Sequence, residues 1–157
     1  MGRSFHWMNR KRTLAKLYKM VETGGGVVIV SEGRGYGAWT GRSTGWRAAL
    51  DTTVKIYLGP RRRAGGSYYK PSRKDFADFI RESPFQTFRT YRQKVTFAWD
   101  LKGIVGYSYS RSLSAKPLFG KRVRAFERDL KQALRAANHS AKFVDHATLE
   151  AFVAIRR

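Results

Sequence analysis

Four consecutive apolar residues, Val27-Val28-Ile29-Val30, constrain the fold more than any other segment of the chain. They follow the glycines at 24–26, and they do not alternate with polar residues as a half-exposed strand does. A short apolar run bounded by glycines predicts a strand that is buried on both faces. Such a strand needs other elements on both sides of its sheet, so we expect a layered arrangement of helices and strands.

Helical periodicity surrounds this strand. Residues 10–22 have apolar side chains three and four positions apart, and Asn9 is a candidate N-cap. The other expected elements are, in order, a helix from 43 or 44 to 58, a short helix opened by a capping box of Ser72 and Asp75, a strand at 87–97, a helix N-capped by Asp100, a longer helix after Gly120 and a strand at 148–155. This order predicts an α/β domain with a thin, three-stranded sheet. With so few strands, at least one sheet edge should be open, and the strand at 27–30 is the apolar candidate.

The totals narrow the class of protein. A length of 157 residues predicts a single domain over 1–157. The absence of cysteine excludes disulfides, thiolate catalysis and cysteine-ligated zinc, and His139 and His146 lack metal-ligand spacing with His6. We therefore expect no metal site. The longest apolar run is far too short to cross a membrane, and no apolar stretch follows the basic N-terminus, so we expect a cytoplasmic protein without a membrane partner.

The charge is strongly unbalanced. Lys and Arg total 32 against 11 Asp and Glu, which gives a net charge of +21. Such a charge attracts polyanions, and non-specific binding of nucleic acid is expected at low salt. The same arginines could equally decorate solvated faces. The basic clusters are 10–12, 61–63, 70 with 73–74, and 121–124, and Tyr68 and Tyr69 flank the third of these with rings that could stack on bases.

A glycine-rich segment after the strand invites a nucleotide-binding interpretation. Residues 31–37 read Ser-Glu-Gly-Arg-Gly-Tyr-Gly. However, Glu32 abuts the first glycine, the next helix is expected several residues late, and no acidic residue lies about 20 positions further on to hold a ribose. A P-loop is excluded because Gly41-Arg42-Ser43 lacks its lysine. We expect a flexible active-site or surface loop here, and the cofactor-binding residues stay unknown.

Several motifs occur in a consistent order along the chain. They are Gly2-Arg3-Ser4-Phe5-His6-Trp7-Met8-Asn9-Arg10, the glycine turn before 27–30, Ser83-Pro84-Phe85, Ile104-Val105-Gly106-Tyr107-Ser108-Tyr109-Ser110, and Leu118-Phe119-Gly120 followed by Phe126-Glu127. Together they resemble the C-terminal half of class I S-adenosylmethionine-dependent methyltransferases of the type 11 kind. In that family the first motif follows the fourth sheet strand, and the glycine turn leads into the fifth.

The resemblance implies a partial Rossmann-like methyltransferase sheet with flanking helices. Its three strands would be ordered five, seven, six, with the last strand of the chain antiparallel between the other two. The family's first four strands and its glycine-rich cofactor turn have no counterpart here. The resemblance therefore implies a truncated methyltransferase-like chain that uses S-adenosylmethionine only by family relationship, binds it weakly if at all, and is inactive as it stands; whether it is an enzyme stays uncertain.

The resemblance also implies roles for particular residues. His6 would be the catalytic residue that orients or deprotonates a nucleophile. Trp7, Tyr107 and Tyr109 would contact a small-molecule substrate. From the residues alone, Trp7 could equally fill a core at a strand-to-helix corner, and the tyrosines could belong to a helix end with local hydrogen bonds.

Two further interpretations stay open. One is a basic, non-enzymatic module that binds nucleic acid. The other is an interaction subunit, in which a second copy or a partner chain pairs with the exposed edge of the strand at 27–30.

Overall fold

The structure is a computed structural model that describes residues 1, 4–32, 45–61, 63–64, 67–68, 72 and 74–157. The chain divides into two compact units. Unit 1 consists of Met1–Thr40, Pro71–Val95 and His146–Arg157, and unit 2 of Gly41–Lys70 and Thr96–Asp145. The assignment of 1–157 to one domain stays a prediction. None of the helices in the described part of the chain has both the length and the apolar character needed to cross a membrane.

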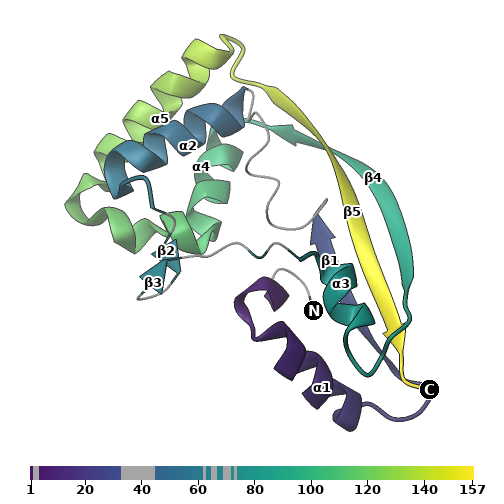
Figure 1. Ribbon diagram of the computed structural model, residues 1–157. Helices are drawn as coiled ribbons and strands as arrows, with labels where there is room; N and C mark the ends of the chain where they lie inside the picture. The colour runs from purple at the N-terminus through teal and green to yellow at the C-terminus, as the bar shows by residue number, and fades with distance from the viewer. Residues whose placement is uncertain (2–3, 33–44, 62, 65–66, 69–71, 73) are drawn as a thin grey trace. The chain divides into compact units, whose positions relative to one another are not determined.

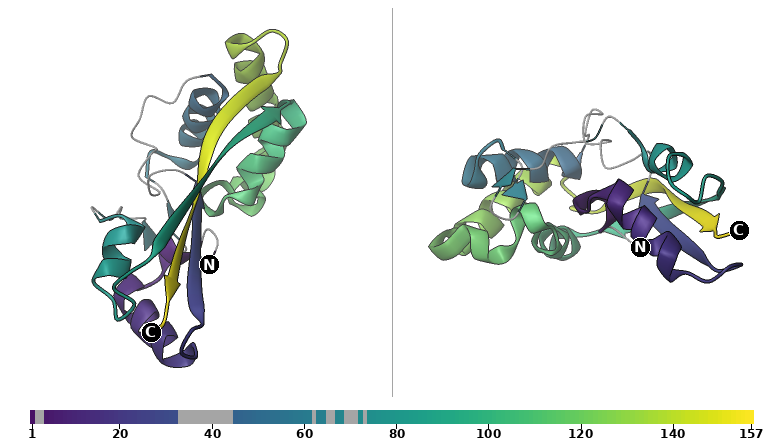
Figure 2. Two further views of the ribbon diagram at one scale, coloured as in Figure 1. Left: turned by 90° about the vertical axis from the view of Figure 1, so that its right-hand side faces the viewer. Right: turned by 60° about the horizontal axis from the view of Figure 1, so that its bottom comes forward.

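The main sheet has three strands: β1 (Gly26–Glu32), β4 (Arg89–Trp99) and β5 (Phe143–Ile155). Their spatial order is β1-β5-β4, and β5 pairs antiparallel with β1 in a register that places Ile29 opposite Phe152. Figures 1 and 2 show β5 running beside β1. The sequence-based expectation of an α/β fold, with the last strand lying between its two predecessors, is confirmed. β5 begins five residues earlier than expected, at Phe143 rather than at 148.

Helices cover one face of the sheet in unit 1. They are α1 (Arg10–Met20), N-capped by Asn9 as expected, and α3 (Phe76–Arg81). The buried residues of this core are Phe5, Leu14, Val27, Ile29, Phe76, Ala77, Ile80, Phe85, Phe152 and Ala154. The T-shaped contact of the Phe5 and Phe76 rings, with centroids 5.3 Å apart, joins the start of the chain to α3.

The face of β1 that points away from α1 and α3 is partly exposed, contrary to the prediction. Burial alternates along the strand, with Ile29 only 1% exposed while Val28 and Val30 are 42% and 40% exposed. The expectation that Val27-Val28-Ile29-Val30 is buried on both faces is therefore wrong for the described residues. The apolar run predicted a strand correctly, but it could not show that only one layer of helices would pack on it.

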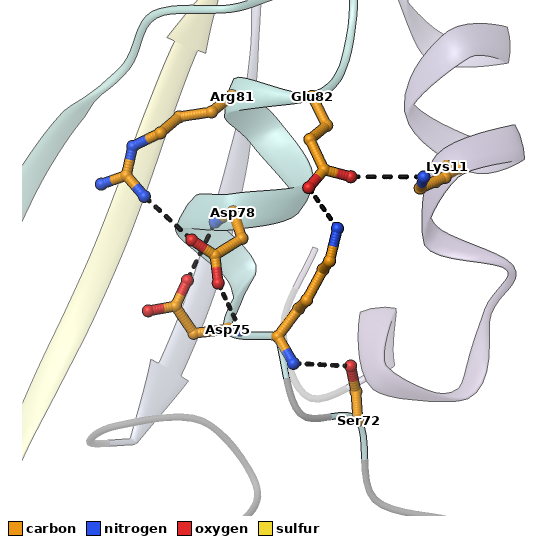
Figure 3. A network of polar contacts seen from close by, with 7 residues as sticks. Lys11, Ser72, Asp75, Asp78, Arg81 and Glu82 are labelled. Carbon is orange, nitrogen blue, oxygen red and sulfur yellow. Dashed lines mark hydrogen bonds and ion pairs between the residues drawn. The ribbon is translucent and has the colours of Figure 1, made fainter.

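A polar network joins α1 to α3 (Figure 3). Glu82 accepts from Lys74, and its other oxygen lies 3.3 Å from the Lys11 ammonium. The hydrogen bonds from Lys74 and then Lys11 lower the pKa of Glu82. The capping box of α3 uses Asp75 as N-cap and Asp78 as its partner, not Ser72 and Asp75 as expected. Ser72 instead accepts from the Lys74 amide, because the helix begins three residues later than the sequence indicated.

Unit 2 is largely helical. It contains α2 (Trp46–Leu58), α4 (Leu101–Ser110) and α5 (Val123–Ala137), with the 3-10 segments Ser112–Ser114 and Lys116–Arg122 between the last two. Asp100 caps α4 by accepting from the Gly103 amide, as expected. The core is formed by Trp46, Leu50, Val54, Ile104, Phe119, Phe126, Leu130, Leu134 and Phe143. A two-stranded hairpin of β2 (Arg63–Ala64) and β3 (Ser67–Tyr68) was not expected from the sequence.

Candidate functional site

The turn that holds His6 and Trp7 opens unit 1. It is a short 3-10 helix, Phe5–Trp7, anchored in the core by Phe5. The His6 side chain is buried, whereas Trp7 is 42% exposed, and the two rings lie 4.6 Å apart. The His6 carbonyl accepts from the Arg10 guanidinium at 2.9 Å, which fixes the turn to the first residue of α1. This turn therefore combines a buried imidazole with an exposed indole.

The first residue of the chain, Met1, forms backbone hydrogen bonds with β1. The Met1 ammonium donates to the Val28 carbonyl, and the Met1 carbonyl accepts from the Val30 amide at 3.0 Å. These two bonds are the pattern of a parallel bridge between Met1 and Ile29. Met1 therefore lies beside β1 in parallel orientation. In α/β sheets, ligands bind beyond the carboxyl ends of parallel strands.

Tyr107 belongs to an aromatic cluster in unit 2. Its ring lies 5.5 Å from that of Trp46 and 5.3 Å from that of Trp99. Trp46 begins α2 and is almost completely buried. The Arg47 guanidinium covers the Trp46 ring at 4.6 Å and forms an ion pair with Asp145. Tyr107 therefore has well-defined packing partners, and its role as a substrate contact stays a prediction.

Tyr109 points to a different part of the same unit. Its hydroxyl donates to Glu127 at 3.0 Å, and its ring lies 6.0 Å from those of Phe119 and Phe126. Burial, followed by the bond to Glu127, raises the pKa of Tyr109 well above its usual value. The phenol is therefore protonated at neutral pH. These contacts make Tyr109 part of the packing between α4 and α5, and its role toward a substrate also stays a prediction.

A partly buried ion pair in unit 2 could not be found from the sequence. Arg111, just after α4, lies 3.5 Å from Asp51 of α2, and its guanidinium also approaches Ser114 at 3.3 Å and the Tyr107 ring at 5.4 Å. Burial raises the pKa of Asp51, although Arg111 opposes the shift. Arginine and aspartate sit 60 positions apart in a chain full of arginine, so no local signal distinguishes this pair. It holds the end of α4 against α2.

The four predicted site residues fall into two groups. His6 and Trp7 belong to unit 1, and Tyr107 and Tyr109 to unit 2. The structure brings His6 and Trp7 into contact with each other. The two tyrosines both lie on α4, but their side chains contact different partners on other elements. The action of all four residues on one substrate stays a prediction.

The described residues do not form a site for S-adenosylmethionine by themselves. Such a site needs a glycine turn that leads from a strand directly into a helix. The described glycines stand elsewhere: Gly24 and Gly25 precede β1 and Gly26 begins it, Gly45 and Gly59 flank α2, Gly103 and Gly106 lie within α4, and Gly120 interrupts a helical segment. The glycine-rich segment at 33–37 lies outside the described residues. In the same part of the chain, no group of three or more His, Asp or Glu side chains could hold a metal ion.

No family model matches the chain, and no curated protein matches it. Among solved structures, the chain is similar to a candidate type II methyltransferase from Anaeromyxobacter dehalogenans, with 19% identical residues and a TM-score of 0.43. The match covers 99% of this chain and 60% of that protein, so the chain spans less than two thirds of its length. The fold class rests on the strand order β1-β5-β4 itself.

Proposed function

We propose that this chain forms the acceptor-side part of a class I S-adenosylmethionine-dependent methyltransferase, and that it transfers no methyl group by itself. The observation that carries the proposal is the sheet order, with β5 antiparallel to β1 and placed between β1 and β4. The motif resemblance implies the same order. The described residues provide no cofactor cradle, so the donor would have to be bound by another polypeptide segment.

The turn of His6 and Trp7 is the proposed acceptor site. The exposed Trp7 indole offers an apolar wall for a planar small molecule. The adjacent imidazole of His6 would orient the nucleophilic group of that molecule or accept its proton. The location supports this role, because the turn follows Met1, whose bonds to Val28 and Val30 form a parallel bridge with β1, and ligands of α/β sheets bind beyond the carboxyl ends of parallel strands.

Calorimetry tests the cofactor part of the proposal. We expect no saturable heat when S-adenosylmethionine is titrated into the purified chain, which corresponds to a Kd above about 1 mM. S-adenosylhomocysteine serves as the second probe, because it shares the adenosine group and lacks the methyl group. Binding of either compound in the micromolar range would show that the chain holds the donor itself, and the proposal would then fail.

A second titration tests the acceptor part. Phenols, catechols and aromatic carboxylic acids are added to labelled protein, and the Trp7 indole and His6 imidazole resonances are followed by NMR. We expect saturable shifts at both residues with at least one class of compound, and loss of the His6 shift in Trp7→Ala. Val28→Ala is the matched control, since it also removes an exposed apolar group from unit 1. Shifts confined to other residues would remove Trp7 and His6 from the site.

The alternative function, a basic module for nucleic acid, is favoured by one specific feature. Tyr68 on the β2–β3 hairpin is half exposed, and the Arg61 guanidinium lies 5.4 Å from its ring. Such a pair can stack on an unpaired base. Binding to single-stranded RNA that falls steeply with salt and weakens in Tyr68→Ala would support this function, whereas a flat salt response would eliminate it.

A further inference from the structure

β1 is an edge strand, although its sequence is that of a central one. In the described part of the sheet the order β1-β5-β4 leaves no strand on the outer side of β1. All residues from Gly26 to Val30 are uncharged and four of them are apolar. Edge strands of soluble proteins usually carry lysine, proline or a bulge that prevents further pairing. β1 has none of these, so its composition is suited to a strand with a neighbour on each side.

The Met1 bridge gives the direction and register of that missing neighbour. Because Met1 bonds to Val28 and Val30, the backbone groups of the even-numbered residues of β1 point outward, and those of Val27 and Ile29 point toward β5. A segment that runs parallel to β1 and ends at the position of Met1 would continue this pattern. A carbonyl of this segment would accept a hydrogen bond from the outward Val28 amide, and one of its amides would donate to the Gly26 carbonyl.

The sheet face that α1 and α3 leave uncovered extends across all three strands of unit 1. Arg92 of β4 forms an ion pair at 2.7 Å with the buried Glu150 of β5, which places the even-numbered residues of both strands on the helix-covered face. The odd-numbered residues of β4 and β5 therefore lie on the opposite face, together with the even-numbered residues of β1 that pair with β5. The exposed apolar side chains there are Val28, Val30, Tyr91 and Ile155, with Val153 partly buried among them. An open edge and an apolar face thus meet at β1.

We infer that the outer edge of β1 is a docking site for an extended, apolar polypeptide segment that runs parallel to β1, with Met1 marking the last residue of its register. The partner is a strand of a larger α/β sheet, in which a helix then covers Val28 and Val30. A second copy of this chain fits less well, since two β1 edges related by a twofold axis would pair antiparallel and displace Met1. The identity of the partner as the cofactor-binding part rests on the proposed function, whereas the docking edge itself does not.

A tethered strand tests the inference. The residues Thr-Val-Thr-Val-Thr are added directly before Met1, which places them beside the start of β1 at high effective concentration. The control extension has proline in place of the second valine, two residues before Met1, where the backbone amide would face the Gly26 carbonyl. Hydrogen exchange of the Val28 amide, which faces the open edge, is compared with that of Ile29, which faces β5.

We expect the extension to slow exchange at Val28 at least tenfold relative to Ile29, and the proline control to leave the ratio as in the original chain. An unchanged ratio with the Thr-Val extension would overturn the inference. So would a concentration-dependent dimer of the original chain in which the Val28 amide is already protected, because a second copy would then fill the edge. The readout involves no methyl transfer, so failure of docking leaves the cofactor titrations unaffected, and micromolar cofactor binding would refute the proposed function without touching the docking edge.

Discussion

Two adjacent valines on β1 should differ sharply in their contribution to stability. Val27 is buried against α1 and α3, whereas Val28 is 42% exposed on the uncovered face. Replacing valine by alanine removes two methyl groups, worth about 1.6 kcal/mol when fully buried. The cavity left at Val27 raises its cost to about 2–2.5 kcal/mol. At Val28 only somewhat more than half of the side chain is buried, so the cost falls to about 1 kcal/mol.

The comparison is well controlled. Val27→Ala and Val28→Ala are the same substitution at neighbouring positions of one strand, so the lower strand propensity of alanine affects both alike. We expect the free energy of unfolding in urea to be lower by about 1–1.5 kcal/mol in Val27→Ala than in Val28→Ala, at equal m-values. In thermal unfolding followed by circular dichroism, this corresponds to a Tm difference of about 3–5 °C. Equal losses for the two variants would mean that both faces of β1 are buried, and the uncovered face would have to be abandoned.

Three further predictions concern the polar contacts of the two units. Arg111→Met should lower the free energy of unfolding by about 1–3 kcal/mol, because the partly buried Asp51 loses its ion-pair partner. The double variant Arg111→Met with Asp51→Asn should recover part of this, and the exposed Arg128→Met should cost less than about 0.5 kcal/mol in the same urea titration. Glu82 has a lowered pKa in the folded state, so its contribution to stability is present above its ordinary pKa and lost as the pH falls through the folded value. Glu82→Gln should therefore lose less stability than the original chain when the pH is lowered from about 6 to about 3, across the ordinary glutamate pKa. Identical acid profiles would contradict the network in Figure 3. Tyr109→Phe should cost about 1 kcal/mol through the lost bond to Glu127, and an unchanged Tm would show that this bond adds no stability.

Much of the fold could be predicted because the chain marks its elements locally. Asn9 and Asp100 cap helices where the sequence places them, and the apolar residues of α5 recur at helical spacing. The position of β5 between β1 and β4 is a long-range property, and only the order of motifs pointed to it. The exposure of Val28 could not be predicted, because an apolar side chain does not reveal whether a second layer covers it.

The candidate site was less accessible from sequence. The His6–Trp7 turn follows from a compact motif, and the structure supplies its local geometry. Tyr109 looked equivalent to Tyr107 in the motif, yet residues two apart on a helix point to different sides and so meet different partners. The Arg111–Asp51 pair depends on how α2 packs against α4, which no local pattern encodes.

Strand order in solution is the measurement that tests the central claim most directly. The account predicts a strong nuclear Overhauser effect between the Hα protons of Val28 and Val153, which face each other across a non-hydrogen-bonded pair of β1 and β5. It also predicts none between the Hα protons of β1 and those of residues 89–95. Contacts between β1 and β4, or β5 found at an edge of the sheet, would contradict the methyltransferase-type order and with it the proposed function.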